Sequence, residues 1–292
     1  MTAEPEISII SACYNHGKYI NEMLDSVFSQ TFDNFEVVIA DDGSDRDTRK
    51  ILESINRQKV KVLFLKHRGP SEARNSAISN SRGSLILNLD SDDKIAPTLL
   101  EKGKRVFENN QNAGIVYADM EFFGAQTGLF CLKPFSMVDM LRDNLIHSTI
   151  FFRKKDWERS GGYCSEFYSG LEDYDFLLSL LELGVDVFKI PEVLCYYRKY
   201  MNLDKCRSGK RKKSREKMIS LWSLLFKRHQ QLYLKFPDIY YEMLQATERW
   251  KSENPMVTEI KEVIHYVFFQ LRFLLSRSRY LKQYINIRGE SF

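Results

Sequence analysis

The sequence predicts an α/β protein with a doubly wound, mostly parallel, Rossmann-like sheet and a C-terminal helical extension. Two observations predict the sheet: short apolar runs alternate with helical periodicity through the first 110 residues, and each run ends on polar or charged residues. Strands and helices that alternate with short connections favour parallel strands and right-handed crossovers. The extension is predicted by the mostly helical periodicity beyond residue 217.

The first half of the chain alternates regularly. Strands are expected at 7–13, 35–40, 60–65 and 85–89, and the last of these suits a strand that is buried on both faces. Apolar residues spaced three or four apart predict a helix after each strand. Ser44 and Asp45 can cap the second of these helices, and Pro97 suits the first turn of the fourth.

The second half of the chain is less regular. Strands are expected at 115–123 and 146–152, with one or two more within 185–197, and helices at 154–160 and 176–183. Glycines and a proline make the segment after residue 123 irregular. We therefore expect a domain at 1–200, divided near residue 110, a basic linker at 201–217 and a helical region at 218–292.

Composition indicates an ordinary globular protein, with 43% hydrophobic and 28% charged residues. The net charge of +4 conceals an acidic front part and a basic tail. The five cysteines are odd in number and form no Cys-x-x-Cys pair, so neither a disulfide framework nor a zinc site is indicated. Neither a signal peptide nor an apolar stretch of membrane-spanning length is recognised, and we expect a cytoplasmic location.

The segment 84–93 is the most informative part of the chain. It is a buried strand followed at once by Asp90, Asp92 and Asp93. Ligands of open α/β sheets gather at the carboxyl ends of strands, and Mg²⁺ usually binds one or two carboxylates together with substrate phosphates. The segment therefore predicts a metal–diphosphate site. The alternative is an acidic turn in which Asp93 caps the helix that starts near Pro97.

Other strand ends are expected at the same edge of the sheet, namely 11–15, Asp41-Asp42 and His67-Arg68. The chain has no Gly-x-x-x-x-Gly-Lys-Ser/Thr motif and no Gly-x-Gly-x-x-Gly after its first strand. A P-loop NTPase and a dinucleotide dehydrogenase are therefore disfavoured. Phosphate is expected to be held by a metal and by Arg or Lys. Arg74 is the candidate, with a solvated surface arginine as the alternative.

A second acidic cluster contains Glu172 and Asp173 at the expected start of a helix. Carboxylates at this position are favourable against the helix macrodipole, which is the structural explanation. The functional explanation is a general base, because a hydroxyl that attacks a sugar must lose its proton.

Six short motifs occur in the order and spacing of family 2 glycosyltransferases, which the chain resembles over about residues 5–200. They are the segments 7–15, 41–45, 73–75, 89–93, 161–163 and 172–173. The resemblance implies a GT-A type fold, in which residues 1–110 bind the nucleotide sugar and 111–200 face the acceptor. It also implies inverting transfer from a nucleoside-diphosphate sugar, expected to be UDP-linked, to a hydroxyl of a glycan or lipid-linked acceptor, with Mg²⁺ or Mn²⁺ as cofactor. Polysaccharide biosynthesis at a bacterial cell surface is the expected setting.

The resemblance assigns roles to single residues. Asp90 and Asp92 resemble the Asp-x-Asp pair, with Asp90 near the ribose and Asp92 as metal ligand, and Asp173 resembles the catalytic base. The remaining residues expected to bind the nucleotide are Ser11, Ala12, Cys13, Asp42, Arg74 and Ser91.

The resemblance is incomplete after the last strand. Many relatives carry an Arg-x-His run there that can reach the metal or diphosphate. In this sequence the run is Arg198-Lys199-Tyr200, so the contact is expected to be missing or to come from Arg198 or Lys199. His16 is expected to be structural or exposed, and His147 is the one histidine on the expected acceptor side.

The tail allows two kinds of contact. Apolar residues of 257–284, with arginines nearby, suit packing against the rest of the protein or a second subunit, or a helix lying on the inner face of the cytoplasmic membrane. Nothing beyond the basic run at 205–217 suggests nucleic acid.

Two other functions remain open. One is a nucleotidyltransferase-like enzyme, which the single glycine in 11–17 disfavours. The other is a sugar-nucleotide-binding partner without catalysis, which the intact carboxylates disfavour.

Overall fold

The computed structural model describes residues 4–130, 132–201 and 215–253. The chain divides into two compact units, Met1–Leu221 and Trp222–Phe292. The expected linker at 201–217 lies mostly outside the described residues, and the expected helix at 257–284 lies wholly outside them. Among the described helices, none combines the length and the apolar character needed to cross a membrane.

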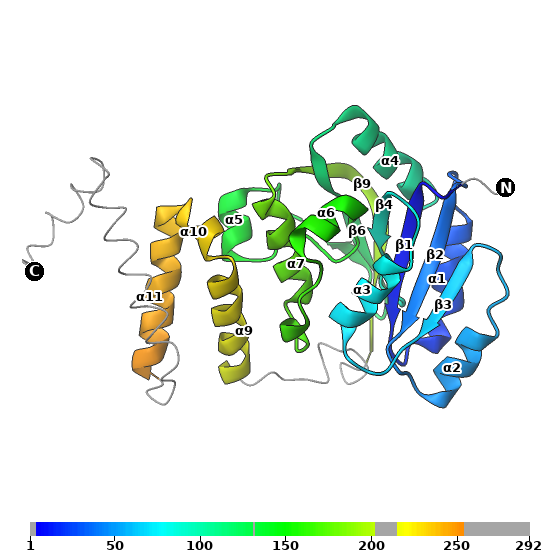
Figure 1. Cartoon of the computed structure of the whole chain (residues 1–292), viewed down its shortest axis with the longest axis horizontal. Helices are drawn as coiled ribbons and strands as arrows, with labels where there is room; N and C mark the ends of the chain where they lie inside the picture. Colours follow the sequence, from blue (N-terminus) through cyan, green and yellow to red (C-terminus); the bar gives the residue numbers. More distant parts are fainter. Residues whose placement is uncertain (1–3, 131, 202–214, 254–292) are drawn as a thin grey trace, which may run out of the picture. The chain divides into compact units, whose positions relative to one another are not determined.

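The first unit is built on one curled sheet (Figure 1). Within the described residues the strand order is β3-β2-β1-β4-β8-β6-β9-β5, with β7 paired to β6. The strands are β1 (Ile7–Cys13), β2 (Phe35–Asp41), β3 (Val60–Phe64), β4 (Leu85–Asn88), β5 (Lys94–Ile95), β6 (Ala113–Gly124), β7 (Gly128–Phe130), β8 (Phe151–Arg153) and β9 (Asp186–Lys199). β1 pairs in parallel with β2 and β4, and β6 with β9, whereas β8 is antiparallel to both β4 and β6. The expected doubly wound, mostly parallel sheet is confirmed.

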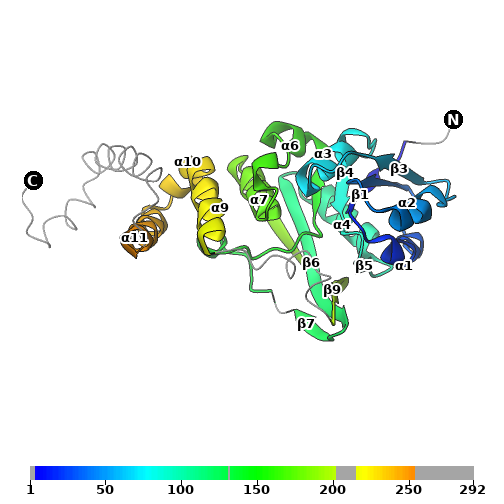
Figure 2. The same cartoon turned by 90° about the horizontal axis from the view of Figure 1, so that it is seen from below.

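Helices cover both faces of this sheet. They are α1 (Gly17–Phe28), α2 (Arg46–Glu53), α3 (Pro70–Ser79), α4 (Leu99–Asn109), α5 (Met137–Arg142), α6 (Lys154–Ser160), the 3-10 helix η1 (Ser165–Phe167) and α7 (Glu172–Glu182). Figure 2 shows α3, α6 and α7 on one side of the sheet and α1 and α4 on the other. Alternate residues of β1, β2 and β4 pack with α1, α2 and α4 into one apolar core. Burial on both faces explains why these strands are continuous apolar runs.

One expected strand, at 146–152, differs from the structure for an identifiable reason, and the region 185–197 takes the first of its two expected forms. The expected strand at 146–152 is reduced to β8, because side chains hold the preceding backbone in another shape: Asn88 Nδ2 donates to Ser148 O (2.8 Å), and His147 Nδ1 accepts from Thr149 N (3.1 Å). The region 185–197 forms one strand, β9, that continues through Pro191. The pairing of β9 with β6 skips Pro191, so the missing N–H of proline costs no ladder hydrogen bond.

The second unit is helical in its described part. The helix α9 (Arg215–Arg228) crosses the boundary, and α10 (Gln230–Leu234) and α11 (Pro237–Glu253) follow it. The Phe226 ring lies 4.9 Å from the Tyr233 ring and 5.2 Å from the Tyr240 ring, so these side chains hold the three helices together. The described part of the expected helical region at 218–292 is therefore helical, with a break at His229 between α9 and α10.

Candidate active site

The loops after β1 and β2 are joined at the carboxyl edge of the sheet. Asn15 N donates to Ser44 Oγ (2.9 Å), and Asn15 Oδ1 accepts from Asp45 N (2.7 Å). Asn15 has a positive φ of 59°, a conformation that asparagine tolerates better than most residues. Asp45 also caps α2 by accepting from Thr48 N, as expected from the sequence.

Asp42 lies just beyond β2 and fixes the loop that leads into α3. Its Oδ1 accepts from Arg68 N (2.8 Å), its Oδ2 accepts from Gly69 N (2.9 Å), and His67 Nδ1 lies 2.9 Å from Oδ2. Gly69 has a φ of 99°, and a Cβ there would meet the Tyr168 ring. Several contacts to one carboxylate therefore fix the backbone of this loop, which carries an aromatic surface.

That surface consists of three rings. His67 stacks on Tyr14 at 4.3 Å between ring centroids, and Tyr168 OH lies 2.8 Å from His67 Nε2. Tyr14 keeps 45% of its surface exposed although its ring stacks on His67, and an exposed aromatic ring is suited to contact a flat ligand such as a nucleobase. Tyr168 was missed by the sequence analysis, because it follows the short helix η1 and belongs to no periodic pattern.

Ser11, Ala12 and Cys13 lie inside the end of β1 rather than in a loop. Ser11 and Cys13 have no exposed surface, and Ala12 is half-buried. Burial raises the pKa of the Cys13 thiol to about 12, so the thiol is not reactive at neutral pH. Of these three predicted nucleotide-binding residues, only Ala12 has surface to offer.

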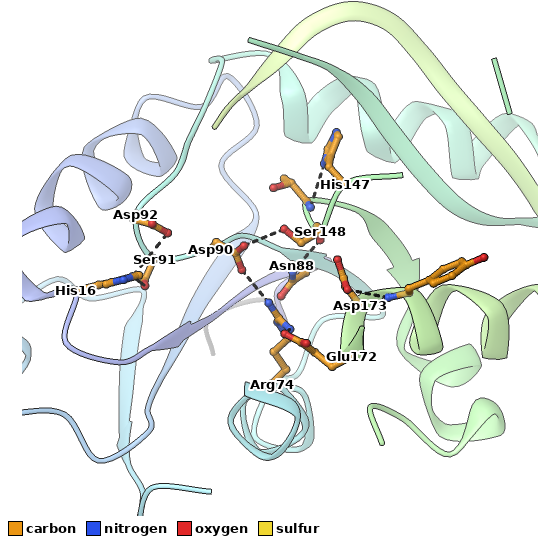
Figure 3. Close-up of polar contacts among 12 residues, drawn as sticks. His16, Arg74, Asn88, Asp90, Ser91, Asp92, His147, Ser148, Glu172 and Asp173 are labelled. Atoms are coloured by element: carbon orange, nitrogen blue, oxygen red, sulfur yellow. Dashed lines mark hydrogen bonds and ion pairs between the residues drawn. The ribbon is translucent and has the colours of Figure 1, made fainter. Parts of the chain in front are cut away.

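Arg74 forms a buried ion-pair bridge at the centre of the site (Figure 3). Its Nη2 lies 3.0 Å from Asp90 Oδ1, and its Nη1 lies 3.2 Å from Glu172 Oε1. The other oxygen of Asp90 accepts from Ser148 Oγ (2.9 Å). The surface alternative for Arg74 is therefore wrong, and both oxygens of Asp90 have partners within the protein.

Asp92 lies beyond Asp90 on the side facing α1. Tyr200 OH donates to its Oδ2, and His16 Nδ1 lies 3.7 Å from its Oδ1. Arg198 reaches the main-chain oxygen of Asp92 (2.8 Å) and stacks on the Tyr19 ring. Neither cation of the Arg198-Lys199 pair is bonded to the Asp92 carboxylate. Arg198 contacts the main-chain oxygen instead, and Lys199 lies over the Phe122 ring.

Asp93 does not cap the following helix. That helix, α4, has Thr98 as its N-cap, and the Asp93 carboxylate instead accepts from Arg198 N (2.8 Å). Burial and the neighbouring Asp92 raise the pKa of Asp93 well above its usual range. The structural alternative proposed for the acidic segment is therefore wrong for this residue.

Asp173 stands in the first turn of α7, across Arg74 from Asp92 (Figure 3). Its Oδ1 accepts from Tyr174 N, and its Oδ2 accepts from Asn144 Nδ2 at 3.4 Å. Burial, and then the neighbouring Glu172 carboxylate, raise the pKa of Asp173 to about 6. A carboxylate with this pKa is a stronger base than an exposed aspartate and is still ionised at neutral pH.

The Gly161-Gly162-Tyr163 motif supports the site from behind. Asn75 Oδ1 accepts from both Trp157 Nε1 and Tyr163 N (2.9 Å each), which ties α3 to α6. Gly162 has a φ of 72°, and a Cβ there would come within 2.8 Å of Asn75 Oδ1.

Both ring nitrogens of His147 have partners within the chain, since Nδ1 accepts from Thr149 N and Nε2 lies 3.0 Å from Ala118 O. An acceptor contact by His147 is therefore not supported.

A divalent cation fits at Asp92 only together with a substrate. The described residues contain no group of three or more His, Cys, Asp or Glu side chains that could hold a metal. Asp92 nevertheless offers a carboxylate, and Mg²⁺ commonly uses one carboxylate with substrate phosphates. The donor set therefore agrees with a cation that binds along with a diphosphate.

The sequence profile described as Glycosyl transferase family 2 matches residues 8–154. The chain belongs to glycosyltransferase family 2. The match runs from the second residue of β1 to the end of β8 and includes Asp42, Arg74, Asp90 and Asp92, whereas Asp173 lies outside it.

Relatives of this family-2 chain include polysaccharide synthases. The chondroitin synthase of Escherichia coli is 31% identical over 200 residues, which are 66% of this chain and 29% of that protein. TuaG of Bacillus subtilis, a putative teichuronic acid biosynthesis glycosyltransferase, is 30% identical over 67% of this chain and 79% of its own length. The chain spans less than a third of the chondroitin and hyaluronan synthases that it matches.

Two solved structures share the fold. A fragment of S. aureus TarS in complex with UDP-GlcNAc superposes with a TM-score of 0.63 at 23% identity, covering 76% of this chain and 66% of that one. A mannosyltransferase from Pyrobaculum calidifontis in complex with GDP-Man and Mn²⁺ has a TM-score of 0.55 at 16% identity, covering 97% and 84%. The expected GT-A type fold is confirmed.

Proposed function

We propose that the chain is an inverting glycosyltransferase that moves a sugar from a nucleoside-diphosphate sugar to a hydroxyl of a glycan or lipid-linked acceptor. The proposed donor is a UDP-sugar. The observation that carries the proposal is Asp173. It is a half-buried carboxylate of raised pKa that faces the Asp90–Arg74 pair from the far side of the site. Family membership supports sugar transfer, and the TarS fragment solved with UDP-GlcNAc supports UDP.

The proposed reaction needs one proton acceptor. The acceptor hydroxyl oxygen attacks C1 of the donor sugar while Asp173 takes the hydroxyl proton. The bond from C1 to the diphosphate oxygen breaks, and its electron pair leaves with the nucleoside diphosphate. Attack opposite the leaving group inverts the configuration at C1. Asn144, which donates to Asp173, would hold the carboxylate in its orientation.

The leaving diphosphate needs positive charge. Asp92 would hold Mg²⁺ or Mn²⁺, which when bound neutralises charge developing on the diphosphate. Arg74 would act indirectly, by holding Asp90 near the ribose, and Ser91 would lie beside the diphosphate. The uracil would lie against Tyr14 and near Asp42, with Ala12 lining the pocket next to the buried Ser11 and Cys13.

The same proposal covers the larger organisation. Residues 1–110 would bind the donor, 111–200 the acceptor, and 201–217 would link them to the helical region 218–292. The polysaccharide synthases among the relatives support a role in bacterial cell-surface polysaccharide synthesis. The expected cytoplasmic location, with membrane contact or dimerisation through the last helices, remains part of the proposal.

The test is a donor panel. We expect one UDP-sugar, incubated with Mn²⁺ and without acceptor, to be slowly hydrolysed to UDP, and chelation to stop the release. Adding glycan acceptors should raise the rate, and NMR should show inversion at C1 in the product. Pyrophosphate release instead of UDP would indicate a nucleotidyltransferase. Tight donor binding without UDP release, even with acceptors, would indicate a binding partner.

A further inference from the structure

Asp92 is flanked by two side chains that the proposed reaction does not use. His16 Nδ1 lies 3.7 Å from Asp92 Oδ1, and Tyr200 OH donates to Asp92 Oδ2. The imidazole comes from the loop after β1 and the phenol from the residue after β9, so two segments far apart in the chain meet at one carboxylate. Figure 3 shows His16 beside Ser91 and Asp92, away from Arg74 and Asp173.

The spacing suits two ligands of one cation. Metal–ligand bonds of about 2.0–2.2 Å place two ligand atoms roughly 3 Å apart in a cis arrangement and roughly 4.2 Å apart in a trans arrangement. The 3.7 Å between His16 Nδ1 and Asp92 Oδ1 falls between these limits. A small rotation of either side chain would therefore allow both atoms to bind the same ion.

Neighbouring groups hold the imidazole in place. His16 is the N-cap residue of α1, and the following Gly17 is packed so closely that a Cβ would lie 2.7 Å from Thr48 Cα. The Tyr19 ring meets the imidazole edge-on at 6.0 Å. Ser91 Oγ lies 3.1 Å from Nδ1, and because a serine hydroxyl can rotate, it leaves the Nδ1 lone pair available to a cation.

We propose that His16 and Asp92 together bind the divalent cation, with His16 as a nitrogen ligand through Nδ1 and the donor diphosphate supplying oxygen ligands. This inference rests on the proposed metal-dependent function. Tyr200 is a positioning residue that orients the Asp92 carboxylate from its other oxygen. A nitrogen ligand makes the site select Mn²⁺ or Co²⁺ over Mg²⁺, because imidazole binds transition metals better than it binds Mg²⁺.

Electron spin echo envelope modulation of Mn²⁺ bound to the full chain with UDP is the direct test. A bound imidazole nitrogen gives a ¹⁴N coupling, which we expect in the wild type and not in His16→Ala or His16→Gln. A wild-type Mn²⁺–UDP complex without ¹⁴N coupling would overturn the inference, and this result needs no variant.

Affinity measurements give a second readout. With UDP present, we expect His16→Ala to weaken Mn²⁺ binding at least about tenfold and Mg²⁺ binding less than about threefold, since Mg²⁺ gains little from nitrogen. Tyr200→Phe should weaken both ions about tenfold, as loss of an orienting partner does, and keep the ¹⁴N coupling. Lys18→Ala removes a neighbouring exposed charge and should change neither the Mn²⁺ affinity nor the Mg²⁺ affinity. If His16→Ala lowered the affinities for Mn²⁺ and Mg²⁺ by the same factor, His16 would be a contact of the diphosphate, and the inference would be overturned.

Failure of the inference and failure of the proposed function give different results. If Mn²⁺ binds with UDP and depends on Asp92 but shows no nitrogen, the inference fails and the metal-dependent function stands. If no Mn²⁺ binds with UDP, the metal-dependent function fails, and the inference fails with it.

Discussion

Single residues of the site are held by charge as much as by shape. The buried guanidinium of Arg74 lies between Asp90, which follows β4, and Glu172, which begins α7. One cation therefore joins the strand edge that would bind the donor to the helix that carries the proposed base. A buried carboxylate that loses its partner is costly, because nothing replaces the lost hydration.

Arg74→Ala should consequently lower the free energy of unfolding by about 3–5 kcal/mol, since it leaves Glu172 buried without this cation. Arg49→Ala is the matched control, because Arg49 pairs with Glu53 on the surface and should matter by about 0–1 kcal/mol. Urea unfolding measures both. Equal effects of the two substitutions would show that the bridge adds nothing to stability.

The pKa of Asp173 sets the expected pH dependence. A base must be ionised, and burial raises the pKa of this carboxyl to about 6. The kcat measured at saturating donor and acceptor should therefore be level above pH 7 and fall about tenfold per pH unit below 6. A profile that stays level down to about pH 4, the value of an ordinary aspartate, would contradict this assignment.

At the scale of elements, connections decide more of the site than strands do. The strands that precede Asp42 and Asp90, β2 and β4, are fully buried apolar runs and were predicted, whereas β5, β7, α5 and η1 were not. These missed elements are short, and each contains too few residues to show the periodicity of a strand or a helix. His16 and Tyr200 were missed as neighbours of Asp92 for a related reason, since only the paths of β1 and β9 bring them together.

The paired glycines after α6 test how tightly these elements are joined. Gly161 and Gly162 both have positive φ, but a Cβ on Gly161 meets nothing within 4 Å, whereas one on Gly162 would lie 2.6 Å from Trp157 Nε1. Gly161→Ala should cost about 1–2 kcal/mol of stability, from the left-handed backbone alone. Gly162→Ala should cost about 1–3 kcal/mol more, from overpacking. Equal melting temperatures of the two variants would contradict the close contact.

At the scale of the whole molecule, the sequence predicted the doubly wound, mostly parallel sheet and the alternation of strands and helices over the first 110 residues. It could do so because buried parallel strands and their terminal carboxylates leave a local pattern. The partners of Arg74 and Asp92 come from segments far apart in the chain, and no local pattern records such contacts. The residues that would contact the sugar and the acceptor are expected within 124–148, a segment without a periodic pattern.

Metal removal tests whether UDP release depends on a divalent cation held at the carboxyl edge of the sheet. We expect chelation to lower UDP release at least about 100-fold, since charge stabilisation at the leaving group contributes several kcal/mol, and added Mn²⁺ to restore it. Asp92→Asn should cause a similar loss that Mn²⁺ does not restore. Chelated enzyme that keeps full turnover would refute the metal assignment.

The central claim, that Asp173 is the base of an inverting glycosyl transfer, is tested most directly by Asp173→Asn. The amide keeps the size of the side chain and part of its hydrogen bonding but cannot take a proton. With the exposed Asp47→Asn as control, we expect kcat to fall about 100-fold or more while the Kd of the donor stays within a few-fold. A variant that keeps at least half of the wild-type kcat, or that loses donor binding as strongly as turnover, would contradict the claim.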